Sequence, residues 1–111
     1  MQHRDETILK KIISEINTAF DMLGETAYSE FYFTEMMKRA VCMTVINIGE
    51  LVKNLSDEFR AQHKNVPWRF IAGFRDVAAH KYQTLKMADV YKTVIEDFPK
   101  LKDDIQNILN G

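Results

Sequence analysis

Apolar residues recur near the start of the chain at the spacing of a helix. Positions three and four residues apart fall on one helical face. This pattern predicts a helix from about residue 5 to residue 23, with an apolar face formed by Ile8, Ile12, Ile16, Ala19 and Leu23. Gly24 follows directly and is a typical helix terminator. We therefore expect a first helix that buries one side only.

A second, longer helix is predicted from about Ser29 or Thr34 to Leu55. Its middle, residues 36–51, is apolar on more than one side, in contrast to the one-sided first helix. Such a helix must be covered by neighbours around most of its circumference. We expect it to be the central helix of a bundle. A chain this short cannot easily surround it alone, which hints at a second copy or another partner.

Three further helices are predicted from local signals. Ser56 and the acidic residues after it are typical of an N-cap and first turn, which predicts a short helix to about Gln62. Pro67 is typical of a first helical turn and predicts a helix over residues 68–80. Its predicted inward face consists of Trp68, Ile71, Phe74 and Ala78. The last helix is predicted over about residues 88–109, with a kink or break just before Pro99.

These elements predict an all-α protein, an antiparallel bundle of four to five helices with short connections. The chain has four Gly and two Pro among 111 residues, which leaves little room for the tight turns of a sheet protein. It contains no internal repeat, low-complexity tract or linker-like stretch. We therefore expect residues 1–111 to form a single domain.

Composition is typical of a soluble globular protein, with 46% hydrophobic and 28% charged residues. The charged N-terminal segment does not resemble a signal peptide. The longest mostly apolar run, residues 40–49, is roughly half of the ~20 residues that a membrane span needs. The only cysteine, Cys42, lies in this run and is predicted to be a buried core thiol. We expect a cytoplasmic protein with no membrane association.

The net charge of −1 conceals a basic segment between residues 60 and 86. This segment has one acid, Asp76, against six basic residues: Arg60, Lys64, Arg69, Arg75, Lys81 and Lys86. It is compatible with a phosphate-bearing ligand, and Arg69 and Lys81 are candidate phosphate contacts. A solvated helix surface explains the same pattern.

The end of the fourth predicted helix carries groups that could perform chemistry. Asp76 and His80 are four residues apart, so a helix places one above the other. The carboxylate could then accept a hydrogen bond from the imidazole and raise its basicity. Arg75 is five positions from His80 and points away from it on an ideal helix. Both reach one phosphate only if the helix end distorts or a two-fold dimer brings a second copy. Tyr82 would return to the side of Arg75 if the helix continued.

A base, an acid and a guanidinium are what metal-free RNA cleavage requires. The base activates the ribose 2′-hydroxyl, the acid protonates the leaving 5′-oxygen, and the cation stabilises the phosphate. The residue types alone leave another interpretation open, in which Asp76 and His80 form a surface pair and Arg75 bridges to another helix. No His, Cys or carboxylate spacing resembles a structural zinc site, and we expect neither a metal nor a cofactor.

The spacing Arg-x4-His-x-Tyr, present as Arg75, His80 and Tyr82, resembles the signature of HepT-like toxins of the HEPN superfamily. Residues 48–56, 66–75 and 90–101 resemble further segments of that family, so the resemblance covers roughly residues 40–105. The chain departs from the pattern at Asp76, where the family often has Asn. An anion there repels RNA unless Arg75 or a protonated His80 neutralises it.

The resemblance implies a HEPN-type bundle that forms a homodimer with its motif helices facing each other. It implies a metal-independent endoribonuclease that acts as a toxin on RNA, with Arg75 and His80 catalytic. Asp76, from its spacing, is expected to orient His80. The resemblance also implies a cognate nucleotidyltransferase antitoxin, in a type VII-like toxin–antitoxin pair, that transfers AMP to the motif tyrosine, here Tyr82. The added negative charge would block the phosphate site.

A function without catalysis stays open beside this one. The helical dimer could be a docking subunit for a nucleotidyltransferase, with a nucleotide in the motif cleft. The nearly neutral charge favours this alternative, because an efficient non-specific RNA binder usually carries a clear basic excess.

Overall fold

A computed structural model of the chain describes residues 1–111, and its regular elements are all helical. The long helices are α1 (His3–Leu23), α3 (Glu35–Lys53), α5 (Trp68–His80) and α7 (Phe98–Asn110). The short ones are α2 (Tyr28–Tyr32), α4 (Asp57–Gln62) and α6 (Met87–Lys92). A 3₁₀ turn, η1 (Tyr82–Thr84), follows α5, and a π-helical turn, η2 (Thr93–Asp97), joins α6 to α7. The predicted all-α bundle is confirmed.

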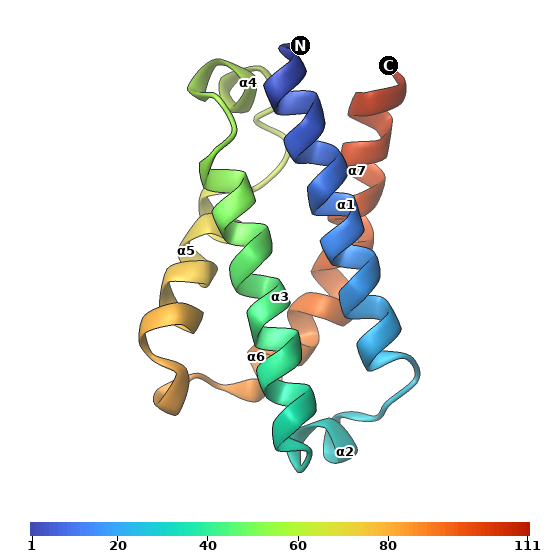
Figure 1. Cartoon of the computed structure of the whole chain (residues 1–111), viewed down its shortest axis with the longest axis vertical. Coiled ribbons are helices and arrows are strands. Elements are labelled where there is room, and N and C mark those ends of the chain that lie inside the picture. Colours follow the sequence, from blue (N-terminus) through green and yellow to red (C-terminus); the bar gives the residue numbers. More distant parts are fainter.

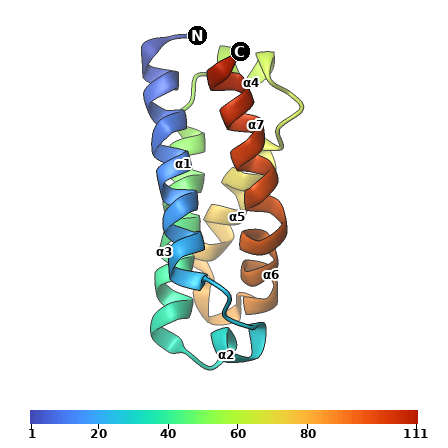
Figure 2. The ribbon, with the colours of Figure 1, turned by 90° about the vertical axis from the view of Figure 1, so that its right-hand side faces the viewer.

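Helix α3 lies between α1 and α5, and it packs against both (Figure 1). In the turned view, α7 lies beside α1 and α6 lies below α7, with both chain ends near α4 (Figure 2). This arrangement confirms that the second long helix is the central one. No helix combines the length and apolar character needed to cross a membrane.

Helix α1 begins and ends where local signals predict, and it supplies much of the core. All five residues of its predicted apolar face are buried, and Leu9 joins them. Gly24 ends the helix with a φ of 53°, a left-handed conformation that glycine adopts without a Cβ clash. Cys42 of α3 is also buried, as predicted, and burial raises the pKa of its thiol to about 11.

The second predicted helix is divided in two, which the apolar pattern did not indicate. Phe33 ends α2, and Thr34 takes an extended conformation (φ −108°, ψ 95°) before α3 begins. The Thr34 hydroxyl donates a hydrogen bond to the Glu30 carbonyl oxygen at 2.8 Å, which ties the corner to α2. The corner lets Phe31 enter the core, where it is fully buried. A prediction of a helix beginning at Ser29 was therefore wrong, and one beginning at Thr34 nearly correct.

The predicted kink or break before Pro99 takes the form of the π turn η2, which interrupts the α-helical pattern without ending the helix. Proline has no N–H to donate to the preceding turn and its ring crowds the carbonyl there. The wider π turn accommodates this change without separating α6 from α7, since Pro99 then lies in the first turn of α7.

A buried carboxylate joins the start of α1 to the start of α4. Asp5 is 1% exposed and accepts hydrogen bonds from the Ser56 backbone N–H at 2.9 Å and from its hydroxyl at 2.8 Å. The Ser56 hydroxyl oxygen accepts from the Phe59 N–H at 3.1 Å, which confirms the predicted N-cap. The sequence pattern gave no sign that Asp5 is buried.

Candidate active site

Helix α5 carries the predicted motif and is only partly covered. Of its predicted inward face, Trp68 and Ala78 are buried, whereas Ile71 and Phe74 are half-buried. The Trp68 indole N–H donates to the His63 carbonyl oxygen at 2.9 Å, which anchors the start of the helix. Because α5 packs mainly against α3, its outer side faces solvent.

A glycine of α3 allows Arg75 to lie directly against that helix. A Cβ atom added at Gly49 would come 2.1 Å from the Cβ of Arg75 and 3.2 Å from the Ile71 carbonyl oxygen. No side chain larger than hydrogen fits at this position without a shift of α5. Gly49 therefore determines how closely the motif arginine approaches α3.

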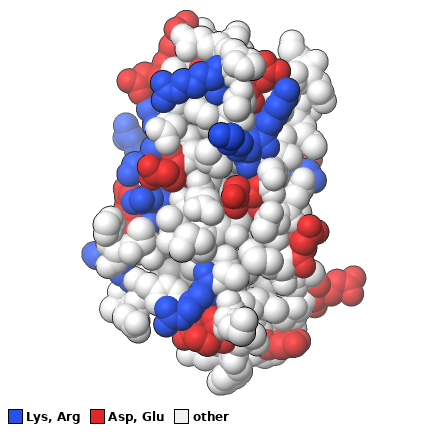
Figure 3. Space-filling view, viewed as in Figure 1, with Lys and Arg blue, Asp and Glu red and all other residues white.

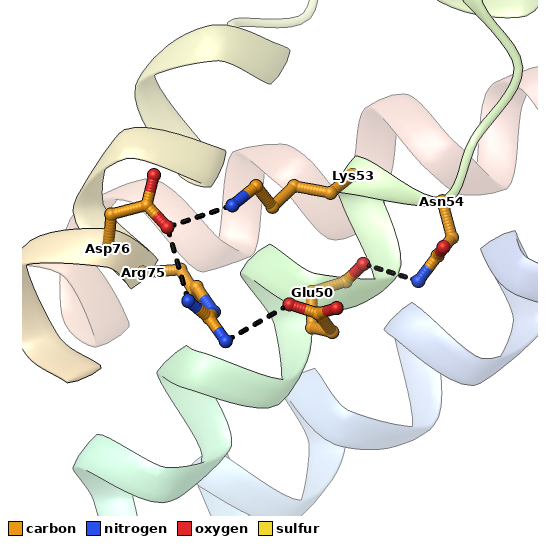
Figure 4. Close-up of polar contacts among 5 residues, drawn as sticks. All are labelled: Glu50, Lys53, Asn54, Arg75 and Asp76. Atoms are coloured by element: carbon orange, nitrogen blue, oxygen red, sulfur yellow. Dashed lines mark hydrogen bonds and ion pairs between the residues drawn. The ribbon is translucent and has the colours of Figure 1, made fainter.

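The Arg75 guanidinium is held between two carboxylates (Figure 4). Its Nη2 atom lies 3.2 Å from Oε2 of Glu50, and its Nη1 atom lies 3.2 Å from Oδ1 of Asp76. The Nε atom is buried and has no hydrogen-bond partner, so the guanidinium has an unused N–H. The side chain as a whole is 22% exposed.

Asp76 pairs with Lys53 instead of His80. Its Oδ1 atom accepts a hydrogen bond from Lys53 Nζ at 2.9 Å and another from Arg75. These bonds, that of Lys53 first, lower the pKa of the Asp76 carboxyl. The expected hydrogen bond between His80 and Asp76 is absent, and the carboxylate is bonded instead to Lys53 of α3 and to Arg75. Lys53 and Arg75 thus offset the negative charge of Asp76, which would otherwise repel RNA.

His80 is the last residue of α5 and is exposed. Its side chain makes no hydrogen bond or ion pair within the chain, so both ring nitrogens are available to a ligand. Arg75, by contrast, is directed toward α3. The helix end does not bring the two groups together in one chain.

Tyr82 leaves the direction of α5 and packs on the start of α3. Lys81 ends the helix, and Tyr82 lies in η1, so it does not return to the side of Arg75. Its hydroxyl donates to Glu35 Oε2 at 3.1 Å, and the Arg39 guanidinium lies 4.8 Å from the centre of its ring. Burial and the bond to Glu35 raise the pKa of the Tyr82 phenol.

Tyr82 and Arg75 therefore contact opposite parts of α3. Their partners there, Glu35 and Glu50, are separated by fifteen residues, or about 22 Å of helix axis. The predicted residues do not form one pocket within a single chain.

The two candidate phosphate contacts, Arg69 and Lys81, are exposed at opposite ends of α5. Arg69 borders a hollow between α4 and α5, together with Lys53. Basic and acidic side chains alternate on the face shown in Figure 3, without one continuous basic surface. No group of three His, Cys, Asp or Glu side chains is arranged to hold a metal ion.

Sequence reasoning did not identify Glu50 and Lys53 as parts of this network. Both lie in the segment after Gly49, at positions three apart on one face of α3. A charged pair beside a helical glycine was the available signal.

The sequence is similar to those of known proteins. Residues 9–108 match the model of a family described as Ribonuclease HepT-like. The chain is 32% identical to a protein named "Putative RNase" from Caldanaerobacter subterraneus subsp. tengcongensis, over 91% of this chain and 90% of the relative. It is 29% identical to the "Probable ribonuclease HepT" of Thermococcus cleftensis, over 97% of this chain and 98% of the relative. No solved structure gives a significant match.

Proposed function

Because this chain belongs to the Ribonuclease HepT-like family, we propose that it is the toxin of a type VII-like toxin–antitoxin pair and cleaves RNA without a metal ion. The single observation that carries the proposal is the contrast between two side chains of α5. Arg75 is fixed by two carboxylates with one N–H unused, and His80 is exposed with both nitrogens free. A fixed cation and a free acid–base group are what this reaction requires.

In the proposed reaction, His80 takes the proton of a ribose 2′-hydroxyl. The 2′-oxygen then attacks the adjacent phosphorus, and the bond to the 5′-oxygen breaks. A second imidazole, His80 of the partner subunit, donates a proton to that leaving oxygen. Arg75 stabilises the charge that develops on the phosphate. The products are a 2′,3′-cyclic phosphate and a 5′-hydroxyl.

We place the second histidine on another copy because one chain does not bring Arg75 and His80 together. The outer side of α5 supports a homodimer through this helix. Phe70 and Val77 are seven residues apart, so they lie on one face of α5, and they are 56% and 44% exposed. An apolar stripe of this kind is suited to an isologous contact across a two-fold axis.

Asp76, in this proposal, acts on Arg75 instead of His80. Together with Glu50 it holds the guanidinium in one orientation, and Lys53 offsets its charge. Asp76 and Glu50 are thus positioning residues. Lys81, which follows the histidine and is exposed, is the candidate for a second phosphate contact.

We further propose that a nucleotidyltransferase antitoxin inactivates the protein by transferring AMP to Tyr82. The phenol oxygen would attack the α-phosphorus of ATP and release pyrophosphate, and Glu35, 3.1 Å away, is placed to accept the phenol proton. The modification would separate Tyr82 from Glu35 and add a negative charge near Arg39.

The test is cleavage of a panel of RNAs by the purified protein in excess EDTA, with intact mass recorded to exclude a modified Tyr82. We expect cleavage by the wild type and a loss of at least about a hundredfold in Arg75→Ala and in His80→Ala. His3→Ala, which removes another exposed histidine, is the matched control and should cleave normally. Circular dichroism checks that each variant folds. Full activity of His80→Ala would contradict the assignment.

The second candidate function is a non-catalytic docking subunit for a nucleotidyltransferase. Two observations favour it: the net charge of −1, and the occupation of Arg75 by carboxylates in the free chain. Unmodified, folded protein that binds a nucleotidyltransferase but cleaves no RNA would establish this function in place of the first.

A further inference from the structure

A broad, shallow groove between α4 and α5 lies beside the motif and has a charge opposite to that of the whole chain. Its charged lining consists of four cations and two carboxylates: Lys53, Arg60, Lys64, Arg69, Asp57 and Asp76. Four positive against two negative charges leave an excess of two, whereas the chain carries −1. The local charge therefore favours an anionic ligand, although the chain as a whole is slightly acidic.

The excess charge can be assigned to two residues. Lys53 pairs with Asp76, and Arg60 pairs with Asp57, so these four charges compensate one another. Lys64 and Arg69 form no ion pair and are both exposed. Lys64 lies in the connection between α4 and α5, and Arg69 lies in the first turn of α5. Two unpaired cations at the mouth of a groove can each contact a phosphate without breaking an existing bond.

Small residues line the groove between the charged side chains. Ala61 comes from α4, and Ala72 and Gly73 come from α5. A Cβ atom at Gly73 would meet nothing within 4 Å, so the surface there is open. A polymer backbone can approach such a surface closely.

The groove leads toward the motif. Arg69, Gly73 and Asp76 lie on one face of α5, at spacings of four and three residues, and His80 is four residues further along the same face. At the inner end of the groove, Asp76 is bonded to Arg75 at 3.2 Å. A strand that occupies the groove therefore reaches Asp76, which holds Arg75, and follows the face of α5 that ends at His80.

We propose that this groove binds the sugar–phosphate backbone of single-stranded RNA next to the cleaved bond, with Lys64 and Arg69 each holding one phosphate. The inference rests on the proposed ribonuclease function and adds the path of the substrate. A shallow positive groove with a smooth lining suits a single strand, which it follows through the backbone with little regard for sequence. It accounts for RNA binding by a chain without an overall basic charge.

The test measures binding of a fluorescently labelled single-stranded RNA of mixed sequence by anisotropy at several salt concentrations. All proteins carry His80→Ala, so that the RNA stays intact. Adding Lys64→Gln and Arg69→Gln should weaken binding roughly tenfold at low salt and reduce the slope of log affinity against log salt by about 1.4 in magnitude, or about 0.7 per phosphate contact. The matched control replaces by Gln Lys11 and Lys92, which are exposed on α1 and α6 and form no ion pair.

A second pair of variants tests the groove without removing a cation. Gly73→Glu and Gly73→Gln place side chains of equal size on the open surface, and only the first adds a negative charge. We expect Gly73→Glu to bind RNA several-fold more weakly than Gly73→Gln. Two results together would contradict RNA binding in the groove. Gly73→Glu and Gly73→Gln would bind RNA equally, and the Lys64/Arg69 double variant would lose no more affinity than its charge-matched control.

Failure of the groove can be told apart from failure of the proposed function. Wild-type protein that cleaves RNA, combined with groove variants that bind like the charge-matched control, contradicts the groove alone. Wild-type protein that neither cleaves nor binds the RNA contradicts both. A selective loss in the groove variants supports the groove whatever the RNA sequence.

Discussion

Two helices flank α3 and are held to the protein by different means. Helix α1 buries a continuous set of aliphatic side chains, among which Leu9, Ile12 and Ile16 are completely covered. Helix α5 buries only Trp68 and Ala78 and adds a glycine contact and a network of ion pairs. The first contact excludes water, whereas the second keeps charged groups at a surface that ligands can reach.

This difference separates the main source of stability from the proposed site of function. Burial of apolar surface is the main favourable term in folding, so the side of α3 that packs on α1 should carry more of the stability. Exposed ion pairs each contribute little to stability, about 0–1 kcal/mol, but they orient side chains. The α5 side can therefore hold an unused N–H and a free imidazole at small cost to the fold.

The largest effect is expected from matched isoleucine truncations on the two helices. Ile12→Ala in α1 removes a fully buried side chain and should lower the free energy of unfolding by about 2–5 kcal/mol. Ile71→Ala in α5 removes a half-buried one and should cost roughly half as much. Urea denaturation followed by circular dichroism measures both. Equal losses would show that the two contacts are energetically alike.

Next in size is a comparison of two helical glycines. Gly49→Ala must displace α5, because its Cβ would lie 2.1 Å from that of Arg75, and should destabilise the protein by about 1–3 kcal/mol. Gly73→Ala meets nothing and should stabilise it by up to about 1 kcal/mol, since alanine favours the helix. Thermal unfolding of the two variants should shift in opposite directions. A stabilising Gly49→Ala would contradict the close contact.

A smaller change in stability is expected where the network is altered directly. Glu50→Gln removes one of the two carboxylates that hold Arg75, and because Glu50 is 53% exposed the loss should stay below about 1 kcal/mol. If the proposed function is correct, RNA cleavage should nevertheless fall, chiefly in kcat, as the guanidinium loses its orientation. Glu15→Gln, which removes an acid of α1 without an ion pair, is the control. Equal activity in the two variants would remove Glu50 from the site.

The smallest effect concerns the titration of Tyr82. Its pKa lies above the ordinary value of 10.0, so the protonated phenol is favoured in the folded state. The resulting stability is fully present below pH 10.0 and is lost as the pH rises through the higher folded pKa. Glu35→Gln should lower this pKa by removing the charged acceptor. Ultraviolet absorbance of the phenolate, with Tyr82→Phe subtracted, measures the shift; an unchanged pKa would mean that burial alone sets it.

Local signals in the sequence were sufficient for most of the helices. The ends of α1, the Ser56 cap of α4, the start of α5 after Pro67 and the break before Pro99 all lie where they were predicted. Each depends on interactions among residues within one or two turns, which spacing and residue type reveal. The sequence pattern did not predict that a corner at Thr34 separates α2 from α3. This corner depends on the burial of Phe31 against distant parts of the chain.

The tertiary structure decided which residues form hydrogen bonds with the side chains of the candidate site. Asp76 meets Lys53 across 23 residues, and Tyr82 meets Glu35 across 47. Sequence spacing indicated that Asp76 and His80 share a helix face, but it could not show that a lysine of another helix lies closer to the carboxylate. The sequence by itself therefore determined most of the helices and identified the candidate residues for the chemistry. Only the packing of α5 on Gly49 decided which of their charges are paired and which stay free, because such pairing depends on distances between segments that the chain order does not specify.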